Sequence, residues 1–238
     1  MTHAPEVKSS PTRSFLFANE RALQNTLVNG DLGTDGSHRV CFVRSEVPVG
    51  SCIPDIVCVR LSEQPRTDLI PSRFSYRHAF VLSLLRERSP LHVETIAAQS
   101  FEPPDKARLL IEDLALAGAV VPLHTGAFAI SPELLAAEPD VVAIEAKLHR
   151  WKDALRQAKT YKRFADRVVV AMDAHGIPSQ PAALDEFQSA GVGLCAVAPE
   201  ATEWLLHPTP VPGCRGPEWE YLVRTASAPS PQTLWSLR

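Results

Sequence analysis

The stretch Val141–Leu148, VVAIEAKL, decides which fold this chain is expected to adopt. Its first four residues are apolar, as is typical of a strand buried in a sheet. Glu145 and Lys147 follow two residues apart, so on a strand their side chains point to the same face. Either charge alone is costly at the end of a buried strand. The stretch therefore predicts a central strand that ends in a site where an acid and a base act together.

Hydrophobic patterning predicts further elements on both sides of this strand. An amphipathic helix is expected over 14–29, with Phe15, Leu16, Ala22, Leu23 and Leu27 on or near one face. Two short β-branched runs predict adjacent antiparallel strands at 39–44 and 53–60. After the central strand, the pattern predicts a helix over 149–165, a strand at 168–173, a helix from Pro181 to Gly191 and a strand at 192–199. The Pro- and Trp-rich remainder, 201–238, is expected to be an irregular covering segment.

A block of different character lies between the second and third strands. Residues 75–131 predict three helices and then a hairpin around Thr125-Gly126, an order that resembles a winged helix-turn-helix domain. The expected recognition helix and its lead-in hold four acids and two bases: 102, 105, 112 and 113 against 106 and 108. Lys106 and Arg108, with His124 on the wing, could contact DNA, but the acids would repel phosphates. Contact with a protein partner, or self-association, is at least as well supported.

Without this block, the order helix, strand, strand, strand, helix, strand resembles the PD-(D/E)xK nuclease superfamily, with its restriction-endonuclease-like fold. The resemblance rests on Pro54-Asp55 in the second strand and on Glu145-x-Lys147 in the third. The helix after Lys147 carries Gln157-Ala-Lys-Thr-Tyr161, which is similar to the QxxxY motif of the RecB-type branch. The resemblance covers about 14–75 and 140–198. It implies an α/β fold, a mixed sheet flanked by helices with an inserted winged helix, divided as 14–74 and 132–200 (core), 75–131 (insertion) and 201–238 (C-terminal segment).

The two acids suit a hard cation. Asp55 and Glu145, on neighbouring strands, could share Mg²⁺ (or Mn²⁺) through carboxylate oxygens, with the carbonyl of Ala146 as the further ligand that the resemblance implies. Lys147 would orient a water molecule or stabilise charge on a phosphate. First-helix glutamates in this superfamily sometimes add a metal contact, so Glu20 is either a further ligand or a solvent-facing residue.

Two residues of the following helix remain open. Gln157 and Tyr161 lie four apart and so share one helix face. Gln157 is counted with the catalytic residues, because from that face either side chain could reach the substrate backbone or hold the lysine. Tyr161 also fits the apolar stripe of the helix, so core packing is an equal alternative.

Charge supports a nucleic-acid partner locally. From Glu145 to Arg167 there are eight basic and three acidic residues in a chain of net charge −3. This surplus predicts a phosphate footprint, although a solvated helix face would look the same. The candidate DNA contacts are Lys152, Arg156, Lys159, Tyr161, Lys162 and Arg163.

Composition sets the remaining expectations. The chain has 238 residues, 45% hydrophobic and 21% charged, which is ordinary for a soluble globular protein. Five cysteines without a CxxC pair, no apolar signal core and no long apolar run predict a cytoplasmic protein that does not enter a membrane. Two functions follow as expectations: a Mg²⁺-dependent deoxyribonuclease, or a non-catalytic DNA-binding or assembly protein on a degenerate nuclease-like scaffold.

Overall fold

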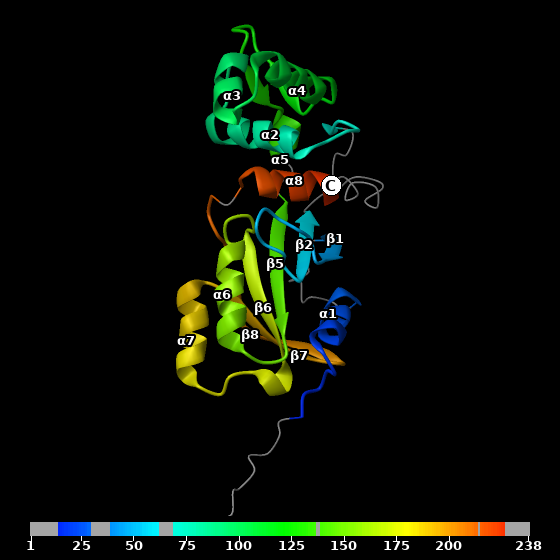
Figure 1. Cartoon of the computed structure of the whole chain (residues 1–238), viewed down its shortest axis with the longest axis vertical. Helices are drawn as coiled ribbons and strands as arrows, with labels where there is room; N and C mark the ends of the chain where they lie inside the picture. The colour runs from blue at the N-terminus through cyan, green and yellow to red at the C-terminus, as the bar shows by residue number, and fades with distance from the viewer. Residues whose placement is uncertain (1–13, 30–38, 62–68, 137–138, 214, 227–238) are drawn as a thin grey trace, which may run out of the picture.

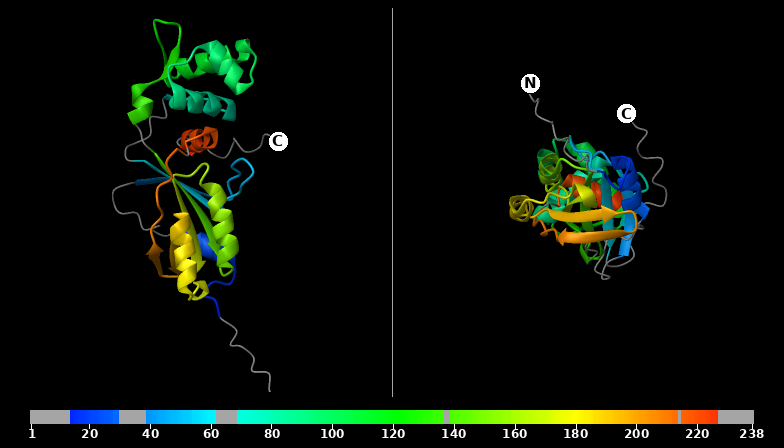
Figure 2. Two further views of the ribbon diagram at one scale, coloured as in Figure 1. Left: turned by 90° about the vertical axis from the view of Figure 1, so that its left-hand side faces the viewer. Right: turned by 90° about the horizontal axis from the view of Figure 1, so that it is seen from below.

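The computed structural model describes residues 14–29, 39–61, 69–136, 139–213 and 215–226. A six-stranded sheet carries helices on both faces, and a group of three helices with a two-stranded hairpin lies beyond one end of it (Figure 1). The side and end views show the same layers (Figure 2). The expected fold class is therefore confirmed as a mixed α/β fold, with a mixed sheet flanked by helices.

The sheet has the strand order β1-β2-β5-β6-β7-β8. Its strands are β1 (Arg39–Ser45), β2 (Ile56–Leu61), β5 (Asp140–Lys147), β6 (Arg167–Asp173), β7 (Gly193–Ala198) and β8 (Ala201–Leu206). β5, β6 and β7 are parallel, and the other neighbours are antiparallel. The prediction that 53–60 and 141–147 lie side by side is confirmed, because β2 pairs with β5.

Strand alternation gives each face of the sheet its own core. Val141 and Ala143 of β5 belong to the core under α6 (Trp151–Tyr161) and α7 (Pro181–Ala190). Val142 and Ile144 belong to the opposite core, which α1 (Glu20–Asn29) covers with Leu23 and Leu27. Helix α6 connects β5 to β6 and α7 connects β6 to β7, as parallel neighbours require.

The block between β2 and β5 forms a lobe with its own hydrophobic core. It contains α2 (Tyr76–Arg88), α3 (Val93–Ser100), α4 (Pro104–Leu116), β3 (Val120–Pro122) and β4 (Phe128–Ile130), and α5 (Pro132–Ala136) leads back into β5. Gly126 has φ +79° in the turn between β3 and β4, a left-handed conformation that glycine adopts without steric cost. Three helices and a hairpin are therefore present where the sequence predicts them.

Three predicted boundaries were wrong. The first helix begins at Glu20 and not at residue 14, because Asn19 caps it through a bond from the Ala22 amide. Strand β2 begins at Ile56, so Asp55 lies just before it and not within it. The helix after β5 covers 151–161 and not 149–165.

The prediction of an irregular C-terminal segment was also wrong for the residues that the structure describes. Residues 201–206 form the edge strand β8, and α8 (Pro217–Ala226) lies between the lobe and the sheet (Figure 1). The Trp219 side chain is fully buried in the core beneath α6 and α7. Glu220, also fully buried, binds Arg86 of α2 at 2.5 Å and Arg224 at 3.2 Å, so α8 joins the lobe to the sheet.

Candidate functional site

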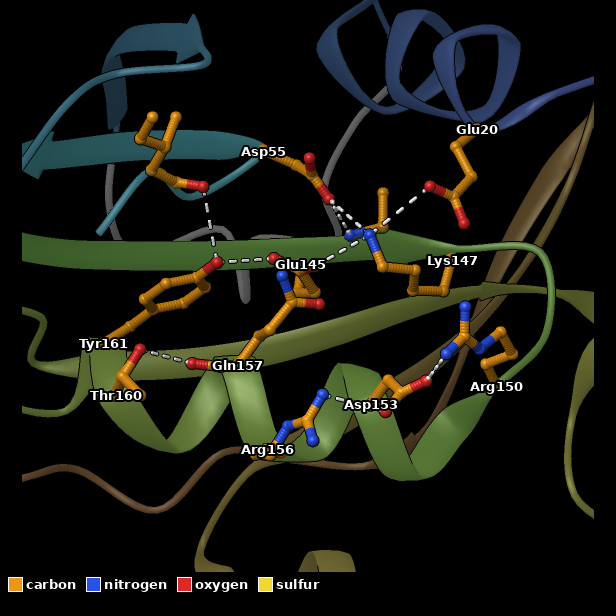
Figure 3. Close-up of polar contacts among 12 residues, drawn as sticks. Glu20, Asp55, Glu145, Lys147, Arg150, Asp153, Arg156, Gln157, Thr160 and Tyr161 are labelled. Carbon is orange, nitrogen blue, oxygen red and sulfur yellow. Dashed lines mark hydrogen bonds and ion pairs between the residues drawn. The ribbon is translucent and has the colours of Figure 1, made fainter. Parts of the chain in front are cut away.

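Four charged side chains meet at the end of β5. The Lys147 Nζ lies 2.8 Å from Glu145 Oε1, 3.3 Å from Glu20 Oε2 and 3.7 Å from Asp55 Oδ2 (Figure 3). Three segments distant in sequence supply the acids: α1, the loop before β2, and β5 itself. The structure thus brings together Glu20, Asp55, Glu145 and Lys147, which are called here the carboxylate–lysine cluster.

The strand register explains how Asp55 reaches Glu145. β2 and β5 are antiparallel and pair Ile56 with Ile144, so the residue before Ile56 lies across from the residue after Ile144. The Asp55 carboxylate is then fixed by a bond from the backbone N–H of Ala146, at 2.8 Å to Oδ2. Because Asp55 precedes the strand, its side chain can turn to the sheet end and need not be buried in the core.

Helix α6 fixes the other side of Glu145. The Tyr161 hydroxyl donates a hydrogen bond of 2.6 Å to Glu145 Oε2, while Lys147 binds Oε1 (Figure 3). Both residues are buried, with 2% of Tyr161 and 1% of Glu145 exposed. The core-packing expectation for Tyr161 is confirmed, since its ring packs in the core. Its hydroxyl contacts Glu145 and not the lysine. With 2% of it exposed, Tyr161 does not present the surface that the expected DNA contact needs.

Glu20 is placed by a network that the sequence did not reveal. The buried Asp173, at the end of β6, accepts hydrogen bonds from the backbone N–H groups of Leu16 and Phe17 at 2.7 and 3.0 Å. Its other oxygen accepts from the His175 amide, in the short 3₁₀ turn Ala174–Gly176. These bonds hold the segment before α1 against the sheet, so the first residue of α1 faces Lys147. An aspartate that ends a buried strand is a signal that could have been noticed.

Burial and mutual charge shift the pKa values of the cluster. Burial raises the pKa of Asp55, although the Ala146 amide and Lys147 oppose the shift. Burial also raises the pKa of Glu145, opposed by the hydrogen bonds from Lys147 and Tyr161. Burial alone would lower the pKa of Lys147, but the hydrogen bond and charge of Glu145, with Asp55 and Glu20, outweigh it and raise that pKa. The ammonium is therefore the charge that makes two desolvated carboxylates tolerable.

The donor chemistry of the cluster suits a hard cation. Carboxylate oxygens are the ligands that Mg²⁺ and Mn²⁺ take in proteins, and here three carboxylates surround one positively charged atom. That atom is the lysine Nζ. Within the described parts of the chain, no group of three or more His, Cys, Asp or Glu side chains is arranged to hold a metal ion. The carboxylates are therefore of the chemical type that binds such a metal, but the Lys147 ammonium lies at the point between them.

The other predicted site residues lie along α6 and just beyond it. Gln157 points from the helix toward β5 (Figure 3). Lys152, Arg156, Lys159 and Arg163 are exposed, which a phosphate footprint requires. Arg156 pairs with Asp153 at 3.0 Å, and Lys152 lies over the Trp151 ring. Lys162 donates to the backbone carbonyl of Ala190, so this lysine ties α6 to α7.

No protein-family model, curated protein or solved structure matches this chain. None of the described helices is both long and apolar enough to cross a bilayer.

Proposed function

We propose that this chain is a divalent-metal-dependent nuclease that hydrolyses phosphodiester bonds of DNA. The observation that carries the proposal is the convergence of Glu20, Asp55 and Glu145 on Lys147 at the end of one strand. Glu145 is buried and Asp55 is partly buried, and acids packed this closely are typical of sites that need their charge. The proposal includes a restriction-endonuclease-like core for the sheet and a winged helix for the lobe.

Asp55 and Glu145 would hold Mg²⁺ or Mn²⁺, with Glu20 and the carbonyl of Ala146 as further ligands. When bound, such an ion polarises a phosphate and lowers the pKa of water. Lys147 carries a proton at neutral pH, since its pKa is raised. It would donate hydrogen bonds to a phosphate oxygen where negative charge develops. Tyr161 holds Glu145 in one orientation, which keeps the acid directed at the same point.

The surroundings support a polyanionic substrate. Lys152, Arg156, Lys159 and Arg163 are exposed along and just beyond α6, the helix that also supplies Tyr161. Positive charge beside the cluster would hold the phosphates that flank a cleaved bond. The acidic α4 of the lobe instead suits a protein partner, so target or partner selection is proposed for the lobe.

A second candidate function has its own observation. The cluster is already compensated without a metal, because one ammonium contacts all three carboxylates. A non-catalytic DNA-binding or assembly protein could keep this cluster only as an ionic link between α1, β2 and β5.

Cleavage assays separate the two functions. Purified protein is incubated with plasmid, linear duplex and single-stranded DNA in Mg²⁺, Mn²⁺ or EDTA. The nuclease proposal expects cleavage that needs the metal and is lost in Asp55→Asn and Glu145→Gln. Glu186→Gln, which removes an exposed acid from α7, is the matched control and should cleave normally. Intact DNA in every metal would leave the non-catalytic function in its place.

A further inference from the structure

A pocket opens beside the carboxylate–lysine cluster, on the Tyr161 side of Glu145. It is formed by the turn before β2 and by the C-terminal half of α6 with the residues just after it. Its lining residues are Ser51, Cys52, Ile53, Arg156, Gln157, Thr160, Tyr161 and Arg163. Tyr161 lines this pocket and donates a hydrogen bond to Glu145 of the cluster. A ligand in the pocket would therefore lie next to the candidate site.

The turn and Arg163 are built around each other. Val49 and Cys52 exchange backbone hydrogen bonds of 2.8 and 3.0 Å, which leaves Gly50 and Ser51 at the tip of a tight hairpin. Gly50 has φ +58°, and a Cβ there would come within 3.1 Å of the Arg163 Nη2. Glycine thus permits both the turn and the close approach of the guanidinium. Arg163 Nη2 then donates to Ser51 Oγ at 3.1 Å.

The lining has the donor chemistry of an oxyanion site. None of the described residues that line the pocket is acidic. Ser51 Oγ accepts from Arg163, so its own hydroxyl hydrogen can be donated into the pocket. Arg156, the second guanidinium, is held by Asp153 at 3.0 Å and still presents a largely exposed side chain. The Gln157 amide adds a neutral donor.

We propose that this pocket binds a backbone phosphate of DNA, the one that neighbours the phosphate at the carboxylate–lysine cluster. The inference rests on the proposed action on DNA and names the residues that set where the strand lies. Arg163 and Arg156 supply charge, and Ser51 and Gln157 supply neutral donors. A guanidinium can contact two oxygens of one phosphate, which fixes direction as well as position. The strand would then run from the pocket, past Tyr161, to Lys147.

Cys52 provides a direct test in the unaltered protein. Its side chain is half-buried, lines the pocket and lies 3.2 Å from Arg163 Nη2. Iodoacetamide modification of Cys52 is followed by peptide mass spectrometry in EDTA, so that no DNA is cleaved. Cys58 and Cys195 are internal controls, because burial raises the pKa of each thiol to about 12 and shields it.

Addition of a single-stranded or duplex oligonucleotide should slow Cys52 modification several-fold. An uncharged methylphosphonate oligonucleotide of the same sequence should leave the rate unchanged. Bound DNA that leaves Cys52 as reactive as before would overturn the proposal.

Equilibrium binding of the same oligonucleotide, also in EDTA, tests Arg163. Arg163→Gln should weaken binding roughly tenfold, and its salt-dependence slope should fall by about 0.7–0.9 for one lost phosphate contact. Lys106→Gln removes one exposed charge from α4 of the lobe, away from the proposed path of the strand, and should have a smaller effect. Arg156→Gln, at a more exposed position, should weaken binding to a similar degree. It takes the place of Arg163→Gln in this test if Arg163→Gln folds poorly. Equal losses for the pocket and control variants would contradict the proposal.

These outcomes separate the phosphate pocket from the nuclease proposal. Binding that depends on Arg163 without cleavage in any metal supports the pocket and overturns the enzyme. Metal-dependent cleavage with unchanged binding by Arg163→Gln and Arg156→Gln supports the enzyme and overturns the pocket. A failure to bind any oligonucleotide overturns both.

Discussion

Lys147 is the residue on which the charge balance of the site depends. Its Nζ contacts three carboxylates. Glu145 is only 1% exposed, so water could not take the place of the ammonium beside it. Removing one partner from a buried ionic group leaves a desolvated charge uncompensated. Lys147 is therefore expected to be important to the stability of the metal-free protein.

Lys147→Met should therefore lower the free energy of unfolding at pH 7 by about 3 kcal/mol in EDTA. Urea denaturation measures this loss. Mg²⁺ should restore part of it, because the cation would replace the missing charge. Lys159→Met, at an exposed position, should change the stability little. Equal unfolding midpoints for Lys147→Met and the wild type would contradict the assigned charge balance.

The Tyr161 hydroxyl controls the same balance from the other side of Glu145. Burial raises the pKa values of Asp55 and Glu145, and a cation binds only their ionised forms. As pH is lowered, the stabilisation by Mg²⁺ should accordingly be lost at a pH higher than about 4, the ordinary pKa range of carboxyl groups. The Tyr161 hydrogen bond lowers the pKa of Glu145, so Tyr161→Phe should move this loss to higher pH. Melting temperatures with and without Mg²⁺ from pH 4 to 8 would show the shift, and identical profiles would contradict it.

Among the elements, α1 depends most on contacts distant in sequence. The segment before it is held by Asp173, and only then does Glu20 face Lys147. Asp173 is therefore a residue that positions Glu20. Its effect on metal binding at the site should be measurable apart from any general loss of stability.

Asp173→Asn should lower the affinity for Mn²⁺ even where the protein remains folded, because Glu20 would no longer be held in place. The variant is compared with Glu20→Gln and with the double variant. If Asp173 acts through Glu20, the double variant should bind Mn²⁺ as tightly as whichever single variant binds it more weakly. Additive losses would show that Asp173 supports the fold in another way.

The sequence predicted the central elements because their signals are local. Strand alternation places Glu145 and Lys147 on one face of the third strand. Asp55 comes at the start of the apolar run that predicts the second strand, and pairing of the two strands brings it beside them. The start of α1 was missed although its cap, Asn19, is a local signal. The bonds that hold the preceding segment out of the helix come from Asp173, more than 150 residues away. Helix α8 was missed because prolines surround it, although Pro217, early acids and Arg224 in its last turn are ordinary helix signals.

At the scale of the whole molecule, the lobe and the sheet carry opposite charge features. Helix α4 has Asp105, Glu112 and Asp113 exposed, whereas the exposed positions of α6 include Lys152 and Lys159. Helix α8 joins the two parts through the buried Glu220, its bonds to Arg86 and Arg224, and the core residue Trp219. DNA is therefore expected along the sheet side, beside the carboxylate–lysine cluster.

Lys106→Ala with Arg108→Ala should weaken DNA binding less than Lys152→Ala with Lys159→Ala. Each pair removes two exposed charges, so total charge is matched. Only phosphate contacts release counterions, and the α6 pair should reduce the salt-dependence slope by up to about 2. Fluorescence anisotropy over a salt series gives the slopes. Equal slopes for all variants would remove α6 as the phosphate footprint.

Asp55 and Glu145 together are proposed to hold a divalent cation, and the nuclease proposal depends on this first. Mn²⁺ binding, followed by electron paramagnetic resonance at neutral pH, tests it without any substrate. We expect one ion per chain in the wild type, greatly weakened binding in Asp55→Asn and in Glu145→Gln, and unchanged binding in Glu186→Gln. Wild-type protein that binds no Mn²⁺, or binds it equally well without Asp55 and Glu145, would contradict the claim.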